Sequence, residues 1–345
     1  MLLSRVAEQL YWAARYVERA EDTARVVAEH THLLVDLPTS VPLTWEPLLA
    51  VAGARRLFDT HYPAPDEREI IAFLLADRDN PSSVLSSVIA ARENLRTARE
   101  VIPREAWQAL NDLYLYATSH HAEAVDRRSR GRFLDKVVAE GQRFVGIVGS
   151  VMSRDEAYQM LCLGRFIERA DMTSRVLDVR AVALLARTDA TGNGDTGGAG
   201  DGGSDHDEVQ GAAVLRSLSA LQAYHRRRRG PASGHPTVAF LLRDPDFPGS
   251  IAHCLAQVEA VLGDIPRSEA VDMAARAASR TLVAVANAPL DQLHAGLDEV
   301  QVAIGTVHAQ IQATYFPPVP SPTDEVTAID VRDAPRGPRP GARAD

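Results

Sequence analysis

Apolar residues recur at steps of three and four along most of this 345-residue chain. Such steps place side chains on one face of an α-helix, whereas a half-buried strand needs strict alternation. Alternating stretches of useful length are missing from the sequence. The pattern therefore predicts an all-α protein with about ten helices or more. It is clearest at Leu3, Val6, Leu10, Ala13, Ala14 and Val17, at Val84, Val88 and Leu95, and at Ile251, Leu255, Val258 and Leu262.

Two segments depart from this pattern. Residues 189–211 are rich in glycine and aspartate, and they hold too few apolar side chains to offset the entropy of ordering the backbone. Residues 317–345 are rich in proline, arginine and aspartate. We expect a disordered insertion in the first segment and a flexible tail in the second.

The sequence also repeats itself. ARYVERAEDTAR at residues 14–25 matches GRFIERADMTSR at 164–175 in six of twelve positions, and FLLADRDNPSSV at 73–84 matches FLLRDPDFPGSI at 240–251 in seven of twelve. The matched segments are 150 and 167 positions apart, and the Gly/Asp-rich insertion accounts for the difference of seventeen. Matches in the same order predict a duplication. Repeat one spans about residues 1–148, and repeat two spans about residues 149–316.

Duplicated helical units commonly pack around a pseudo-two-fold axis, at which equivalent faces meet. Two long helices, expected at about residues 2–36 and 153–187, open the repeats and are the best candidates for that contact. The expected architecture is therefore a duplicated helical bundle, in which two pseudo-two-fold-related repeats pack as one domain.

The first of these helices carries charges on the side that it should bury. On a wheel of about 100° per residue, Glu21 falls inside the apolar stripe, and Glu18 and Arg25 flank it. Glu21 and Arg25 have the spacing of an i,i+4 ion pair. The second copy repeats this arrangement, so we expect Glu21 to face its counterpart Asp171 across the axis. The predicted inter-repeat cluster consists of Arg15, Glu18, Arg19, Glu21, Arg25, Arg165, Glu168, Arg169, Asp171 and Arg175.

Three interpretations of this cluster are open. A buried ion-pair network would fix the alignment of the repeats, because buried acids are nearly always paired. Alternatively, Arg15, Arg19, Arg165 and Arg169 would bind an anion or a peptide, since guanidinium groups suit carboxylates and phosphates. A carboxylate-bridged metal site is least favoured, because no histidine has the spacing of a ligand and the arginines repel a cation. We therefore expect no metal.

A second basic motif lies in ARENLRTARE, at residues 91–100. Arg92, Arg96 and Arg99 share one side of a helix, and Asn94 lies beside them. Such a side is either an ordinary solvated stripe or the binding face for an acidic partner.

Four further features are interpreted as structural. The run HRRRR at residues 225–229 is typical of a helix end or a partner-binding patch. Residues 79–81 and 246–248 have the Asp and Pro positions of a helix start. His308 shares one side of the last predicted helix with Gln312 and Tyr315, and we expect a core or interface position there.

Composition excludes several functions. The formal net charge of −9 disfavours a general nucleic-acid binder. No apolar run reaches the length of a transmembrane helix, and the first segment meets Glu8 too early for a secretory signal. Cys162 and Cys254 are expected to be small buried side chains rather than a disulfide. We expect a cytoplasmic protein with no nucleic-acid partner, no membrane contact and no cofactor.

Several motifs together resemble the bacterial alpha-E domain family, long labelled a domain of unknown function. They span about residues 2–316. The family's glutamate- and arginine-rich signature falls on the ten residues of the inter-repeat cluster, and its middle motif falls on Arg92, Asn94, Arg96 and Arg99. The motifs are LSRVAEQLYWAARYVERAEDTAR, ARENLRTARE followed by Trp107, MSRDEAYQMLCLGRFIERADMTSRVLDV and FLLRDPDFPGSI.

The resemblance implies an all-helical protein that works beside other proteins. Genes of family members typically neighbour, or are fused to, a circularly permuted ATP-grasp protein, often with a transglutaminase-like protease. This context implies a helical accessory subunit that binds an ATP-grasp amide ligase or its peptide substrate and has no independent catalytic activity. The sequence agrees with the lack of independent catalytic activity, because phosphate-loop, HExxH, GxSxG and CxxC motifs are missing from it.

The alternative is an enzyme or ligand-binding protein that uses the inter-repeat cluster, with Glu21 or Asp171 as an acid or base. Burial raises the pKa of a carboxyl group, and neighbouring arginines lower it. Acids that line an open pocket would favour this alternative. Acids that are each paired to an arginine, without a cavity, would favour a scaffold.

Overall fold

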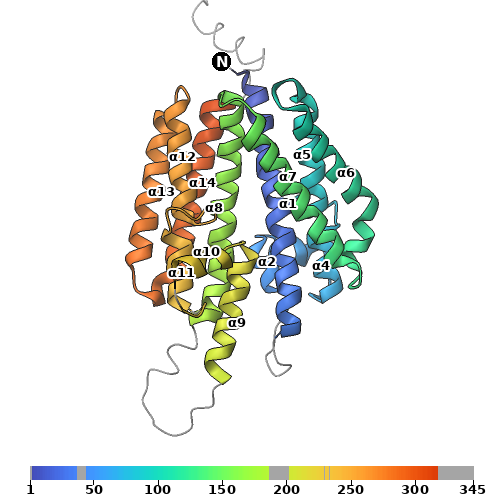
Figure 1. The fold of residues 1–345 in the computed structure, drawn as a ribbon, viewed down its shortest axis with the longest axis vertical. Coiled ribbons are helices and arrows are strands. Elements are labelled where there is room, and N and C mark those ends of the chain that lie inside the picture. The colour runs from blue at the N-terminus through green and yellow to red at the C-terminus, as the bar shows by residue number, and fades with distance from the viewer. Residues whose placement is uncertain (1, 37–43, 186–201, 229, 233, 318–345) are drawn as a thin grey trace, which may run out of the picture.

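The computed structural model describes residues 2–36, 44–185, 202–228, 230–232 and 234–317, and no strand occurs among them (Figure 1). These residues form fourteen α-helices and two short 3-10 helices. The all-α class predicted from periodicity is confirmed. The α-helices are α1 Ser4–Asp36, α2 Pro47–Val51, α3 Arg55–His61, α4 Glu67–Leu75, α5 Val84–Thr97, α6 Arg104–Val125, α7 Arg130–Val151, α8 Glu156–Leu185, α9 Gly202–Ser217, α10 Leu221–Arg227, α11 Gly234–Arg243, α12 Ile251–Asp264, α13 Glu269–Asn287 and α14 Leu293–Tyr315.

Two long helices form the centre of the molecule. α1 and α8 lie side by side, at the positions predicted for the opening helices of the repeats (Figure 1). α1 also packs against α5 and α7, and α8 also packs against α12 and α14. Apolar side chains from both long helices, such as Leu10, Val17 and Ile167, belong to one continuous core. The contact between α1 and α8 is therefore part of the hydrophobic interior.

The two halves of the chain contain the same number of described α-helices. Seven, α1–α7, precede Met152, and seven, α8–α14, follow it. Helix α2 of the first half packs against α8, and α9 of the second half packs against α1. A duplicated bundle would show such exchanged contacts. The boundary near residue 148 and the pseudo-two-fold relation stay predictions.

Small residues allow the close approach of α1 and α8. A Cβ atom added to Gly164 would lie 2.2 Å from the carbonyl oxygen of Tyr11 and 3.2 Å from the Cβ atom of Ala14. Ala14 and Gly164 occupy matching positions of the sequence repeat. The backbones therefore meet one helical turn before Glu18 and Glu168, which brings these two glutamates to the contact.

The second matched motif ends in a helix cap in both copies. The hydroxyl groups of Ser83 and Ser250 each accept a hydrogen bond of 3.0 Å from the amide three residues later. These serines precede the first residues of α5 and α12. Helices do begin soon after residues 79–81 and 246–248, but Pro81 and Pro248 precede the first helical residue by three positions instead of lying in the first turn, because the serines form the caps. The turn before α12 becomes a wall of the site described below.

The Gly/Asp-rich insertion differs from its prediction. Residues 202–211 lie in α9 rather than in a disordered loop, and residues 189–201 lie outside the described residues. Val209 and Ala213 of α9 pack against Leu33 near the end of α1. Tertiary contact therefore stabilises a helix that the local composition does not favour. The predicted tail from residue 318 onward also lies outside the described residues.

Candidate functional site

Glu168 of α8 is held by two arginines of α1. It accepts hydrogen bonds from Arg15 Nε at 2.6 Å and from Arg19 Nε at 2.5 Å, and Arg19 also reaches its second oxygen at 3.0 Å. The guanidinium carbon of Arg15 lies 5.1 Å from the centroid of the Trp12 ring, and that of Arg19 lies 5.6 Å from the Tyr16 ring. These aromatic rings back the guanidinium groups and keep them directed at the carboxylate.

Glu18 of α1 occupies the matching place between two arginines of α8. It accepts a hydrogen bond from Arg169. The second arginine, Arg165, is less closely engaged, because its Nε lies 3.6 Å from Glu18 Oε2 and both of these buried atoms are without a hydrogen-bond partner. The motif therefore forms reciprocal ion pairs, in which the glutamate of each copy meets the arginines of the other.

These ion pairs are buried, so each charge strongly affects the pKa of its partner. Only 2% of Glu168 and 1% of Glu18 is exposed. Burial by itself raises the pKa of the Glu168 carboxyl group, but Arg19 and Arg15 outweigh it and lower this pKa to about 2. Burial lowers the pKa of Arg169, yet Glu18 and Asp22 raise it above its usual value. Glu168 and Arg169 therefore stay charged, which is the behaviour of a buried ion-pair network.

The expectation that Glu21 faces Asp171 is wrong. Glu21 accepts a hydrogen bond from Arg25 of its own helix, as the i,i+4 spacing predicted. A Cβ atom added to Gly141 of α7 would lie 3.1 Å from a Glu21 carboxylate oxygen, so Glu21 points towards α7. Asp171 is paired at 3.0 Å with Arg175 of α8. A helical wheel gives the side on which a residue lies, but not the neighbour that covers this side.

A cleft of about 360 Å³ opens between α1, α7 and α8. Two turns, at residues 218–219 and 247–249, complete its wall. The Thr173 hydroxyl group donates a 3.0 Å hydrogen bond to the Gly249 carbonyl oxygen, which ties the second turn to α8. The cleft is lined by Glu21, Asp22, Arg25, Gln142, Val145, Gly146, Arg165, Arg169, Thr173, Leu218, Ser219, Phe247, Pro248 and Gly249.

The acids near the α1–α8 contact fall into two groups, those bound to the opposite helix and those that line the cleft. Glu18 and Glu168 are bound by arginines of the opposite helix, whereas Glu21 lines the cleft together with Asp22. Sequence analysis missed Asp22, because the repeat search marks residues that both copies share and the second copy has Met172 there. A comparison of the positions at which the two copies differ would have identified Asp22.

The two acids of the cleft hold protons more readily than free carboxyl groups. Burial raises the pKa of Glu21, and the charge of Glu18 raises it further against the opposing effect of Arg25. The pKa of Asp22 is raised well above its usual value by the same two causes, burial and then Glu18. Two carboxyl groups share Arg25, which donates to Asp22 at 3.0 Å. The cleft therefore contains groups that can exchange a proton or compensate a bound cation.

Sequence comparison agrees with this geometry. The profile of a family described as a predicted α-helical domain with a conserved ER motif matches residues 2–316. The chain belongs to the Alpha-E family. Its repeated motif contains Glu-Arg at residues 18–19 and 168–169. In this Alpha-E domain, the glutamate of each pair binds the arginine of the other pair.

Relatives of this Alpha-E domain are longer proteins. Uncharacterized proteins of Mycobacterium bovis and Mycobacterium tuberculosis are each 26% identical over 293 residues, which cover 76% of this chain and 30% of the relative. The chain thus spans less than a third of the length of these curated relatives. No solved structure matches the chain. Among the described residues, no helix is both long and apolar enough to cross a membrane.

The second basic motif of the Alpha-E domain lies against α6, with Arg92, Asn94 and Arg96 on α5. Arg99 does not share that helix as predicted, because α5 ends at Thr97 and Arg99 opens the short 3-10 helix Arg99–Val101. Arg92 Nε donates to the Asn111 side chain at 3.1 Å, and the Arg92 guanidinium carbon lies 4.3 Å from the centroid of the Tyr114 ring. The guanidinium carbon of Arg99 lies 5.4 Å from the centroid of the Trp107 ring. The result is a partly exposed basic stripe with aromatic support, and it does not contribute to the lining of the cleft.

The other members of this motif make local contacts. The Asn94 side chain donates to the Ala90 carbonyl oxygen at 2.8 Å, one turn earlier in α5. Arg96 is exposed and pairs with Glu93 at 2.8 Å. Whether the stripe binds an acidic partner stays a prediction.

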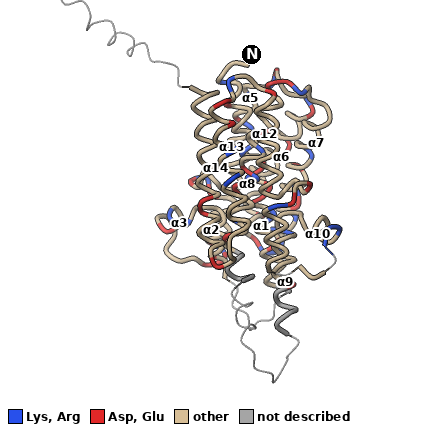
Figure 2. Tube along the Cα trace, turned by 90° about the vertical axis from the view of Figure 1, so that its left-hand side faces the viewer, with Lys and Arg blue, Asp and Glu red and all other residues tan. Residues whose placement is uncertain are grey.

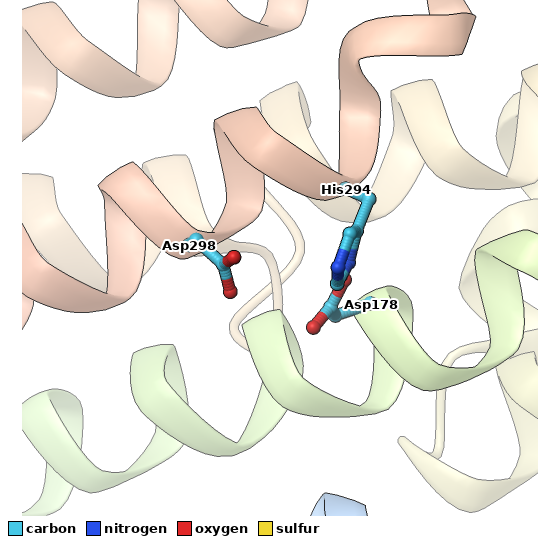
Figure 3. Close-up of side chains that lie close together, drawn as sticks. All are labelled: Asp178, His294 and Asp298. Atoms are coloured by element: carbon cyan, nitrogen blue, oxygen red, sulfur yellow. The ribbon is translucent and has the colours of Figure 1, made fainter.

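A group of metal-ligand type lies between α8 and the start of α14 (Figure 3). His294 Nδ1 lies 2.5 Å from Asp178 Oδ1, and the ligand atoms of these two residues and Asp298 lie within 4.8 Å of one another. The hydrogen bond to Asp178 raises the pKa of His294. As found, the exposed histidine and the half-buried Asp178 form a hydrogen bond that joins the helices. Sequence analysis missed the group, because 116 positions separate Asp178 from His294, and the expectation of no metal stays a prediction.

The interface role expected for His308 is confirmed. The Tyr11 hydroxyl group and His308 Nδ1 share a 2.7 Å hydrogen bond, and the two rings are stacked. Burial, followed by the charge of Arg15, lowers the pKa of His308 to about 4. Tyr315 donates to the Pro266 carbonyl oxygen at 3.2 Å and is buried. These contacts fasten α14 to the rest of the domain.

The remaining predicted features are also structural. The first three residues of the basic run occupy the last turn of α10, which lies on the opposite side of the molecule from α3 (Figure 2), and residue 229 lies outside the described residues. Arg227 pairs there with Asp244 at 3.1 Å. Cys162 and Cys254 are free and buried, as expected.

Proposed function

We propose that this Alpha-E chain is a cytoplasmic, helical accessory subunit of an ATP-grasp amide-ligase system, where it binds the ligase or its peptide substrate. The observation that carries the proposal is the length of the mycobacterial relatives, of which this chain covers 30%. In these proteins an Alpha-E-like segment is joined to further polypeptide. A domain of this kind therefore works beside other domains.

The family resemblance supports the identity of the partners. It points to a circularly permuted ATP-grasp protein first, and to a transglutaminase-like protease second. The buried pairs of Glu18 and Glu168 suit an accessory role, since groups that are already paired are poor nucleophiles and bases. The charged cleft beside them is the part of the inter-repeat cluster that remains open to a bound molecule.

Co-purification tests this proposal. The full chain, carrying an affinity tag, is expressed with a circularly permuted ATP-grasp protein of the same organism. We expect a complex that survives gel filtration at micromolar concentration, and a higher ligase turnover when the chain is present. A ligase that elutes separately at this concentration, and whose turnover does not change, contradicts the proposal.

The second candidate function is an enzyme or ligand-binding protein that uses the cleft. The observation that favours it is the placement of Glu21 and Asp22, two acids with raised pKa values, in the wall of an open cleft. Amide hydrolysis or transfer by the isolated chain, abolished by Glu21→Gln, would support the enzyme. Binding of a small molecule without turnover would support the ligand-binding protein.

A further inference from the structure

We propose that the cleft between α1, α7 and α8 binds a small zwitterion, a free amino acid or a short peptide that carries both an ammonium group and a carboxylate. The proposal rests on the second candidate function and specifies its ligand. It does not depend on the ligase partner.

The positive side of the cleft is Arg165. Its side chain is 28% exposed and lines the cleft, whereas its Nε is fully buried, 3.6 Å from Glu18 Oε2 and without a hydrogen-bond partner. The nearest carboxylate, Glu18, already accepts a hydrogen bond from Arg169. One carboxylate therefore serves two guanidinium groups, and the two terminal nitrogens of Arg165, rather than its buried Nε, are the donors available for a ligand carboxylate.

The matching arginine of the other copy is not available in this way. Arg15 stands at the position of Arg165, but it donates to Glu168 at 2.6 Å and its side chain is only 10% exposed. The loosely held arginine is thus a property of the cleft and not of the repeated motif. A structural role common to both copies would not produce this difference.

The negative side of the cleft is the pair Glu21 and Asp22. Both side chains accept hydrogen bonds from Arg25, so two carboxylates share one guanidinium group. At the matching place in the second copy, Asp171 has Arg175 to itself, and Met172 stands where the first copy has Asp22. The extra carboxylate is therefore also specific to the cleft.

Three carboxylates, Glu18, Glu21 and Asp22, face three guanidinium groups, Arg25, Arg165 and Arg169, but the pairing is uneven: Arg25 bonds both cleft acids, and Arg165 bonds no carboxylate. The raised pKa values of Glu21 and Asp22 agree with a retained proton. A ligand ammonium group would replace that proton and pair with the acids, while the ligand carboxylate pairs with Arg165. A single anion would leave the acids uncompensated, and a single cation would leave Arg165 unused.

The size and the remaining wall of the cleft suit a small ligand with an apolar part. A volume of about 360 Å³ is at the lower end of the range for small-molecule sites. Val145, Leu218, Phe247 and Pro248 provide apolar surface beside the charged groups. Gln142 and Ser219 supply further polar contacts at the wall.

The first experiment uses the unmodified full chain. The twenty standard amino acids and their glycyl dipeptides are screened singly by calorimetry at about 10 mM, which detects dissociation constants near about 1 mM. The best probe is then compared with its N-acetyl and its amide derivatives. We expect at least one zwitterion to bind, and each derivative to bind at least about tenfold more weakly, because each lacks one charge. If no probe binds, or if a derivative binds as tightly as its parent, the proposal is overturned.

The second experiment locates the binding in the cleft. Arg165→Gln and Asp22→Asn should each weaken binding of the best probe at least about tenfold. Asp171→Asn is the matched control, because Asp171 stands at the place of Glu21 in the second copy, and it should leave the affinity unchanged. Helix content and the thermal midpoint show whether each variant is folded. Unchanged affinity in folded Asp22→Asn overturns the proposal. Co-purification with the ligase is a separate measurement, so a failure of zwitterion binding is distinguishable from a failure of the partner function.

Discussion

Glu168 lies almost fully buried between Arg15 and Arg19, and its charge is needed there. Glu168→Gln keeps the shape of the side chain but leaves the buried Arg15 and the half-buried Arg19 without their counter-ion. We expect a loss of about 3 kcal/mol in the free energy of unfolding, because removing one partner of a buried pair is strongly destabilising. Urea denaturation followed by circular dichroism measures this loss.

The matched control for that prediction is Glu93→Gln. Glu93 also pairs with two arginines, Arg92 and Arg96, but on the surface of α5. Its replacement should change the free energy of unfolding by less than about 1 kcal/mol. Equal losses in the two variants would show that burial does not set the strength of the pairs.

His308 gives a residue-scale prediction about pH. Its pKa in the fold is about 4, below the usual 6.5, so the ring stays neutral in the fold. The unfolded chain binds a proton first as the pH falls. The stability of the neutral contact with Tyr11 is therefore fully present above pH 6.5 and is lost as the pH falls towards about 4.

Replacement of the ring isolates this effect. Between these two pH values, the unmodified chain should lose about 1–2 kcal/mol more unfolding free energy than His308→Gln. This figure takes account of the partial exposure of the ring. Urea midpoints of both proteins at a series of pH values measure it. Parallel pH profiles for the two proteins would contradict the assignment.

At the scale of elements, the contact between α1 and α8 depends on a glycine. Gly164→Ala places a Cβ atom 2.2 Å from the Tyr11 carbonyl oxygen, so the helices must separate. We expect a loss of about 3 kcal/mol, at the upper end of the cost of overpacking, despite the better helix propensity of alanine. Thermal unfolding measures the loss.

Gly305→Ala is the control for this helix contact. Gly305 is exposed on α14, and a Cβ atom there would meet nothing within 4 Å. This substitution should raise the unfolding free energy by about 0.5–1 kcal/mol, because alanine restricts the unfolded chain. A loss of stability at both positions would indicate a general intolerance of helix substitutions rather than a close approach.

Helices themselves were largely predictable from local signals. The opening helices agree with the periodicity, and the turn residues predicted the regions in which α5 and α12 begin but not the serines that cap them. Helix α9 was not predictable in this way, because the packing of Val209 and Ala213 against Leu33 stabilises it. A local window of sequence around α9 does not contain the residues of α1 that it contacts.

At the scale of the whole molecule, the two halves depend on each other. Glu18 of the first half and Glu168 of the second are buried against arginines of the opposite half. We expect polypeptides 1–148 and 149–345 to lack cooperative unfolding when separate, since each exposes an apolar face and unpaired charges. Mixing them should restore the helix content and thermal transition of the intact chain.

Circular dichroism of each half and of the mixture tests this dependence. A half that unfolds cooperatively alone, at the midpoint of the intact chain, would show instead that each repeat is an independent domain. Glu168→Gln in the second half provides a further check, because it should weaken the reassembly.

The sequence by itself determined the all-α class, the duplicated motif and the presence of charges in a buried helix. These features follow from periodicity and from the comparison of one part of the chain with another. Only the tertiary structure decided which acid meets which arginine. The close approach at Ala14 and Gly164 brings Glu18 and Glu168 to the opposite helix, and α7 covers Glu21 instead. The cleft depends on three helices and two turns that are far apart in the chain, and no local pattern encodes their meeting.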